Sequence, residues 1–202
     1  MKIIYFILFV FLWQTLAFSS EKDYYESIIN LQAIEKFFVG QPIYLSKDEA
    51  LKAKLRNKLQ RIIDNLEDYK NTNPKKPDDY RLRFFLGKVN SFAYDLDMPG
   101  AWNRSIQYLD EALKLNSESV EVMLIQGKNY MDAQRVDEAY AFYKKADELE
   151  PKGYAKKMLA FALLQKKQIP ESISVIKAYI ANHPEDADAP KLLNALESNR
   201  FS

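Results

Sequence analysis

The stretch VEVMLIQGKNYMDAQRVDEAYAFYKKADELEPKG, residues 120–153, decides the fold of this chain. Its apolar side chains recur three and four residues apart, which is the spacing of an amphipathic helix rather than a strand. Small residues such as Gly127 and Ala139 stand where two helices have to approach closely. Large ones such as Tyr143 stand where a space between helices has to be filled. The stretch therefore predicts two helices that pack as a pair.

The same pattern recurs on both sides of this stretch, which indicates a repeat architecture. Four positions recur at offsets of 34 and then 33 residues, and the three sets are Ser105, Leu109, Ala112 and Ser117; Ala139, Tyr143, Ala146 and Pro151; and Ser172, Ile176, Tyr179 and Pro184. Strand signals are scarce, because no Asn-Gly or Asp-Gly hairpin turn occurs in the sequence.

Residues 120–153 resemble the tetratricopeptide repeat (TPR), a helix-pair repeat of 34 residues. The residues that carry the resemblance are Gly127, Tyr130, Ala139, Tyr143, Ala146 and Pro151. Met123 and Gln126 replace the usual Trp and Leu of the family. Residues 153–186 form a weaker copy, with Tyr179 where a small residue is expected. Residues 80–118 form a third copy, with six extra residues near 94–102.

The sequence thus predicts an all-α fold in which antiparallel helix pairs stack as a short TPR-type solenoid. We expect residues 20–77 to form an N-terminal helical pair, either a degenerate repeat or a cap, with Ser46 as a possible N-cap of its second helix. Residues 78–202 hold the repeats and a C-terminal capping helix. The helices expected in this part are about 79–95, 102–115, 118–132, 136–149, 153–166, 170–181 and 187–198.

Residues 1–19 have the pattern of a secretory signal peptide. Lys2 is followed by an apolar run of 11 residues that is shorter than the ~20 residues of a membrane-spanning helix. Cleavage after Ala17 or Ser19 is expected, and an uncleaved N-terminal anchor is the alternative. In either case the rest of the chain is expected outside the cytoplasm, periplasmic or secreted, with no stable membrane span after cleavage.

Composition argues against most catalytic chemistry. The chain has no cysteine and one histidine, His183, so thiol catalysis and a His-rich zinc site are excluded. His183 is interpreted as a loop residue near a helix end, because nothing else marks a catalytic triad. Asp95, Asp97 and Gly100 resemble the start of a calcium loop, yet Pro99 and Ile106 stand at two of its ligand positions. We therefore expect no enzyme activity, cofactor or metal site.

The charges are balanced overall, with 29 basic and 28 acidic residues, so nucleic acid is not an expected partner. Locally, residues 51–83 carry ten basic and five acidic residues. This segment is either a solvated helix face or a patch for an acidic protein or lipid headgroups, and the first interpretation is preferred because the basic residues alternate with apolar ones at helical spacing.

The TPR resemblance implies that a concave groove, lined by the first helix of each pair, binds a protein or peptide. The corresponding positions are Phe84, Lys88 and Phe92; Leu124, Lys128 and Met131; and Lys157, Phe161 and Leu164. Apolar side chains interleaved with lysines suit a peptide with acidic and apolar residues. The alternative is that these positions pack against a neighbouring repeat or the N-terminal helices.

The functional prediction is therefore a non-catalytic binding scaffold of the cell envelope, with a protein or peptide partner. A structural or assembly subunit of an envelope complex is the alternative. Self-association of the chain is possible, and it would favour this alternative.

Overall fold

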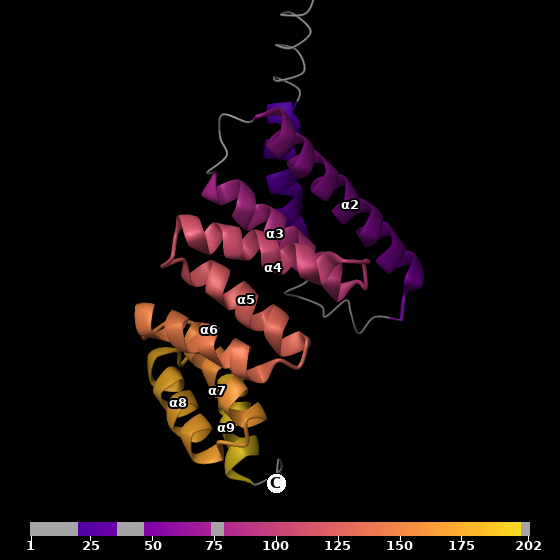
Figure 1. The fold of residues 1–202 in the computed structure, drawn as a ribbon. Coiled ribbons are helices and arrows are strands. Elements are labelled where there is room, and N and C mark those ends of the chain that lie inside the picture. Colours follow the sequence, from indigo (N-terminus) through magenta and orange to yellow (C-terminus); the bar gives the residue numbers. More distant parts are fainter. Residues whose placement is uncertain (1–19, 36–46, 74–78, 199–202) are drawn as a thin grey trace, which may run out of the picture. The chain divides into compact units, whose positions relative to one another are not determined.

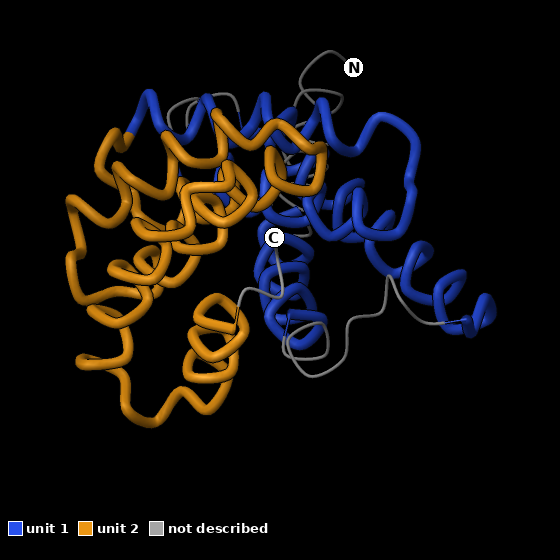
Figure 2. Tube along the Cα trace, turned by 90° about the horizontal axis from the view of Figure 1, so that it is seen from below, with its two compact units in different colours: residues 1–115 blue, residues 116–202 orange. Residues whose placement is uncertain are grey.

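A computed structural model describes residues 20–35, 47–73 and 79–198, and all regular secondary structure in these ranges is helical (Figure 1). The chain divides into two compact units, residues 1–115 and 116–202 (Figure 2). Within each unit, helices that follow one another in the sequence pack together. The predicted all-α class built from stacked helix pairs is confirmed.

Unit 1 begins with an antiparallel pair made by residues 20–35, which are helical, and α2 (Glu49–Thr72). Tyr24 stacks on Tyr69 with ring centroids 4.3 Å apart, and Asn65 donates a hydrogen bond to Ser27 at 3.2 Å. Because the residue order reverses between these contacts, the two helices run in opposite directions.

The N-cap of α2 differs from the prediction. Asp48 caps this helix, because its carboxylate accepts a hydrogen bond from the Leu51 backbone N–H at 2.9 Å. Asp caps as well as Ser does, and it stands directly before the helix, whereas Ser46 lies outside the described residues. The expectation that Ser46 caps α2 is therefore wrong by two residues.

The second pair of unit 1 is α3 (Tyr80–Asp95) and α4 (Ala101–Leu115). The two helices touch at Gly87, where an added Cβ would lie 2.6 Å from Leu109 Cγ. The buried Ser105 hydroxyl donates to the Gly87 carbonyl at 2.8 Å. The small residues of the repeat therefore lie at the contact between the paired helices.

The six extra residues of this pair mostly lengthen helices. Counted against α5 and α6, three of them extend α3 beyond Gly87, two lie in the connection, and one precedes Ser105 in α4. The Arg56 side chain of α2 donates to the Leu96 carbonyl at 2.8 Å and fixes the connection on unit 1.

Unit 2 consists of the helices α5 (Val120–Asp132), α6 (Val136–Leu149), α7 (Ala155–Gln165), α8 (Ile169–Asn182) and α9 (Ala189–Glu197). The bounds of all five lie within two residues of the predicted ones. In the pair α5–α6, an added Cβ on Gly127 would overlap the Tyr143 ring. In α7–α8, the buried Ser172 hydroxyl donates to the Ala160 carbonyl at 2.8 Å.

Two features of the sequence concern export. The predicted signal peptide, residues 1–19, lies outside the described residues. Of the helices that the structure describes, none is both long and apolar enough to cross a bilayer.

Candidate partner-binding groove

The nine residues predicted to line a groove share one property. Each is half-buried, being neither fully accessible nor part of the fully buried core. Their surroundings differ from helix to helix, and these differences decide which of them can meet a partner.

On α3, one of the three predicted residues contacts the N-terminal helix of the same unit. Lys88 Nζ forms an ion pair with Glu35 at 2.7 Å and also lies 5.5 Å from the centroid of the Phe84 ring. The Lys88 side chain is 17% exposed. Phe92 packs against the core of unit 1. At Lys88, therefore, the predicted groove position packs against a neighbouring helix, which is the alternative that the sequence left open.

On α5, the predicted residues are more accessible. Lys128 is 39% exposed and pairs with Asp132, one turn further along the helix, at 2.7 Å. Leu124 and Met131 pack at the edge of a core cluster that Met158 of α7 also contacts. This face of α5 combines apolar side chains with an ion pair that water still reaches.

On α7, the lysine and the two apolar residues behave differently. Lys157 Nζ forms an ion pair with Asp186 at 2.8 Å, and the side chains are 13% and 18% exposed. Phe161 and Leu164 lie half-buried at the edge of the cluster formed with α8 and α9, to which Leu193 also belongs. Lys157 is thus a structural residue, whereas Phe161 and Leu164 remain candidates for partner contact.

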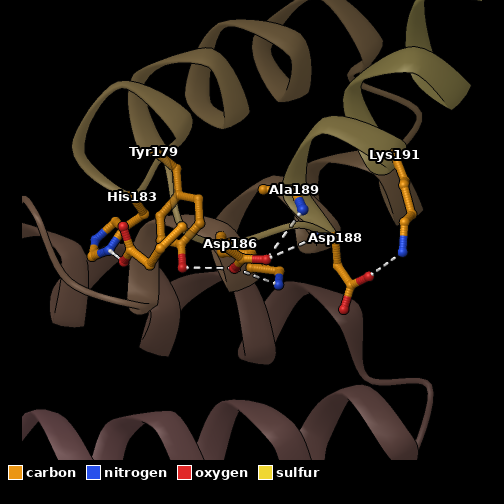
Figure 3. Close-up of polar contacts among 8 residues, drawn as sticks. Tyr179, His183, Asp186, Asp188, Ala189 and Lys191 are labelled. Carbon is orange, nitrogen blue, oxygen red and sulfur yellow. Dashed lines mark hydrogen bonds and ion pairs between the residues drawn. The ribbon is translucent and has the colours of Figure 1, made fainter.

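Asp186 is the centre of a polar junction between α7, α8 and α9 (Figure 3). One carboxylate oxygen accepts from Lys157 and from the Tyr179 hydroxyl at 2.9 Å, and the other accepts from the backbone N–H groups of Asp188 and Ala189. These bonds, with the Lys157 contribution the largest, hold the pKa of Asp186 well below its usual range. The carboxylate both starts α9 and attaches it to α7.

Tyr179 departs from the TPR pattern, and the junction explains why. The side chain is buried, its hydroxyl donates to Asp186, and its ring stacks on His183 at 4.4 Å between centroids. Burial and the bond to Asp186 raise the pKa of Tyr179 to about 12, so the hydroxyl stays a donor. A small residue at this position could not reach α9.

His183 joins two turns of unit 2. Its Nε2 faces the Lys152 carbonyl in the α6–α7 turn, and its Nδ1 lies 3.1 Å from the Glu185 carboxylate. The carbonyl, followed by the carboxylate, raises the pKa of His183 because both acceptors favour the protonated ring. The interpretation of His183 as a loop residue next to a helix end agrees with this position.

The acidic residues near Gly100 belong to the end of a helix. Asp95 is the last residue of α3, and Asp97 has a left-handed backbone with φ of 58°. The Met98 N–H closes the turn on the Ala93 carbonyl at 3.0 Å. Among the described residues, no three His, Asp or Glu side chains are grouped as metal ligands. That calcium does not bind here stays a prediction.

Sequence reasoning missed the role of Asp186. The signal available was its position: Asp186 stands shortly before Pro190 and the last apolar stripe, where an acidic N-terminal residue is common. That Lys157 and Tyr179 meet this carboxylate is decided by the packing of helices and has no signature in spacing.

The chain is similar in fold to solved structures of other helical proteins. A thermophilic TPR protein of Thermus thermophilus, TTC0263, is 18% identical with a TM-score of 0.56, and the match covers 91% of this chain and 98% of that one. The MamA RS-1 ArsTM double mutant is 13% identical with a TM-score of 0.60, over 77% of this chain and 86% of that one. A MamA protein is 16% identical with a TM-score of 0.54, over 88% and 93%.

No protein-family model matches the chain, and no curated protein matches it. The structural likeness therefore establishes the fold: the chain has a TPR-like, all-helical fold. The first helices of its repeat pairs are α3, α5 and α7, which carry all nine predicted groove residues.

Proposed function

We propose that the chain is a non-catalytic scaffold that binds a protein or peptide in the cell envelope. The observation that supports this most directly is the row of half-buried apolar side chains on first helices of unit 2, Leu124 and Met131 on α5 and Phe161 and Leu164 on α7. Apolar groups that a monomer leaves partly accessible contribute binding energy when a partner covers them.

The structure sharpens the expected chemistry of the partner. Of the three predicted lysines, Lys88 and Lys157 are held by Glu35 and Asp186, and Lys128 lies beside Asp132. None of the three is thus available as an isolated positive charge. We therefore propose that apolar side chains, more than acidic ones, select the partner.

Site-specific photo-cross-linking tests this proposal without weakening the fold. A photo-reactive residue at Leu164 or at Lys128 should capture a defined partner in the native envelope, and one at Lys145, an exposed residue of the second helix α6, should not. Equal capture at all three positions would contradict the groove. Capture of only a second copy of the chain would favour the structural-subunit alternative.

A charge-swapped pair provides a further control at Lys128. The double variant Lys128→Glu/Asp132→Lys keeps the ion pair and reverses its direction, so it should melt no lower than the wild type, because an acid that precedes its base by four residues is the more favourable order. If it also binds the captured partner normally, the charges at this position do not orient the partner.

Export is part of the proposal and rests on the sequence of residues 1–19. N-terminal sequencing of the exported protein should begin at Phe18 or Ser20. Intact Met1 in a membrane pellet would replace the cleaved form with the anchored one.

A further inference from the structure

Residues 54–61 of α2 carry a row of positive charge. Lys54, Lys58 and Arg61 are exposed and follow one another at intervals of four and three residues, so they share one flank of the helix. Within the described residues, no ion pair or hydrogen bond is formed by any of the three. We refer to these three residues as the basic stripe.

Of the four acidic residues of α2, Glu49 and Glu67 pair with other basic residues of the helix, while Asp64 and Asp68 are exposed and form no ion pair with the basic stripe. Glu49 pairs with Lys52 and Arg56 at 3.3 and 3.7 Å, and Asp64 accepts a hydrogen bond from Gln60 at 2.8 Å. The four segments outside the description, residues 1–19, 36–46, 74–78 and 199–202, contain one acidic residue in total, Asp78. These four segments therefore hold little negative charge with which to neutralise the basic stripe.

The basic stripe does not stabilise the helix that carries it. Like charges at i,i+4 and i,i+3 repel one another and destabilise a helix slightly. A neighbouring face of α2 supplies the packing, through the buried residues Leu55, Leu59, Ile62, Ile63, Leu66 and Tyr69. The fold therefore does not require the basic stripe.

We propose that the basic stripe of α2 binds the anionic headgroups of a lipid bilayer. Three point charges on the exposed flank of a helix match a laterally extended negative surface, which needs no fixed pocket. The helix paired with α2 exposes Tyr25 and Ile29 by 57% and 65%, and side chains of these types partition into a membrane interface. The apolar run within residues 1–19 brings the chain to a membrane during export.

Vesicle flotation of the full chain tests the proposal. The measured quantity is the ratio of binding to phosphatidylcholine vesicles with and without phosphatidylglycerol, because this ratio cancels any charge-independent insertion by residues 1–19. Each Lys or Arg near an anionic surface contributes about five-fold in affinity, so the variant Lys54→Gln/Lys58→Gln/Arg61→Gln should lower the ratio by about 100-fold. Added salt should lower the wild-type ratio as well.

The matched control neutralises three exposed lysines of unit 2, in the variant Lys144→Gln/Lys145→Gln/Lys152→Gln, and should leave the ratio unchanged. The stripe variant should melt no lower than the wild type, because it removes like-charge repulsion. A wild-type ratio near one, or an equal loss in both variants, would overturn the proposal. Retention on polyglutamate without preference for anionic vesicles would also overturn it, in favour of an acidic protein partner.

Discussion

In α5–α6 the paired helices meet where Gly127 lies against the Tyr143 ring, whereas in α7–α8 they meet where the Ser172 hydroxyl bonds to the Ala160 carbonyl. The first contact is a steric fit between a residue with no side chain and a large ring. The second is a buried hydrogen bond between two small residues. Gly127 and Ala160 stand at the same repeat position, whereas Tyr143 and Ser172 stand at different ones, so the two helix pairs meet through different positions and different chemistry.

The pairs also differ at their ends. Ala146 of α6 is small and buried, as the TPR pattern requires, while the equivalent Tyr179 of α8 reaches Asp186 and helps to attach α9. The last pair, α7–α8, has to hold a single closing helix. A polar junction does this in α8–α9, and four variants can break or sharpen the contrast.

The largest effect is expected from Gly127→Ala. The new Cβ would overlap the Tyr143 ring, which is rigid and completely buried, so the helices have to separate. We expect a loss of about 2–3 kcal/mol in the free energy of unfolding, although Ala is favoured over Gly by ~1 kcal/mol in a helix. Urea unfolding measures the loss.

The double variant Gly127→Ala/Tyr143→Leu should recover part of this stability, since the ring is removed. Ala160→Gly in the other pair should lose only about 1 kcal/mol, from helix propensity. Wild-type stability in Gly127→Ala would show that the α5–α6 contact is not the tight one.

The second largest effect is expected from Asp186→Ala, with a loss of about 2 kcal/mol in the free energy of unfolding. It removes hydrogen bonds to a charged group and leaves Lys157, 13% exposed, without its partner. The control is Asp188→Ala, because the Asp188–Lys191 pair is open to solvent and contributes little. Equal thermal melts for both variants would mean that the junction does not attach α9.

Ser172→Ala should cost about 1 kcal/mol, the net value of one hydrogen bond. The reciprocal change Ala139→Ser should be nearly neutral, because the added hydroxyl can donate to the facing carbonyl as Ser172 does. The pair of chemical-denaturation curves then compares the two contacts directly. If Ser172→Ala is neutral, packing rather than the hydrogen bond determines the α7–α8 distance.

The smallest effect is a pH dependence at His183. Its raised pKa means that the protonated ring stabilises the folded state, fully below the ordinary value near 6.5, and that this stabilisation is lost as pH rises through the folded pKa. His183→Gln should therefore lower the melting temperature at pH 5.5 and have little effect at pH 8.5. A difference that does not vary with pH would assign the effect to stacking on Tyr179. No other histidine interferes, since the chain has one.

The repeat could be predicted well because its signals are local. The helices from α3 to α9 follow from apolar residues at helical spacing, and Gly127, Ala139 and Ala146 mark the close contacts because only small side chains fit there. The predicted bounds 79–95 and 102–115 already assign several of the six extra residues to helices, and α3 (Tyr80–Asp95) and α4 (Ala101–Leu115) agree with these bounds within one residue.

The candidate groove could be predicted from the sequence only in part. The positions of Phe161 and Leu164 on the first helix of a pair follow from the period, and their partial exposure agrees with it. The burial and ion pairing of Lys88 and Lys157 could not be predicted from the repeat period. Each depends on an acid that is distant in the sequence, Glu35 for Lys88 and Asp186 for Lys157.

The sequence by itself determined the helices, their pairing and the sites of closest approach, because side-chain volume and period act between residues that lie near one another along the chain. Only the tertiary structure decided which charged side chains form ion pairs. Lys157 and Asp186 are 29 residues apart, and a carboxylate attracts whichever cation the packing of three helices brings within reach. The fold likewise decides that the basic stripe of α2 forms no ion pair with any of the described residues.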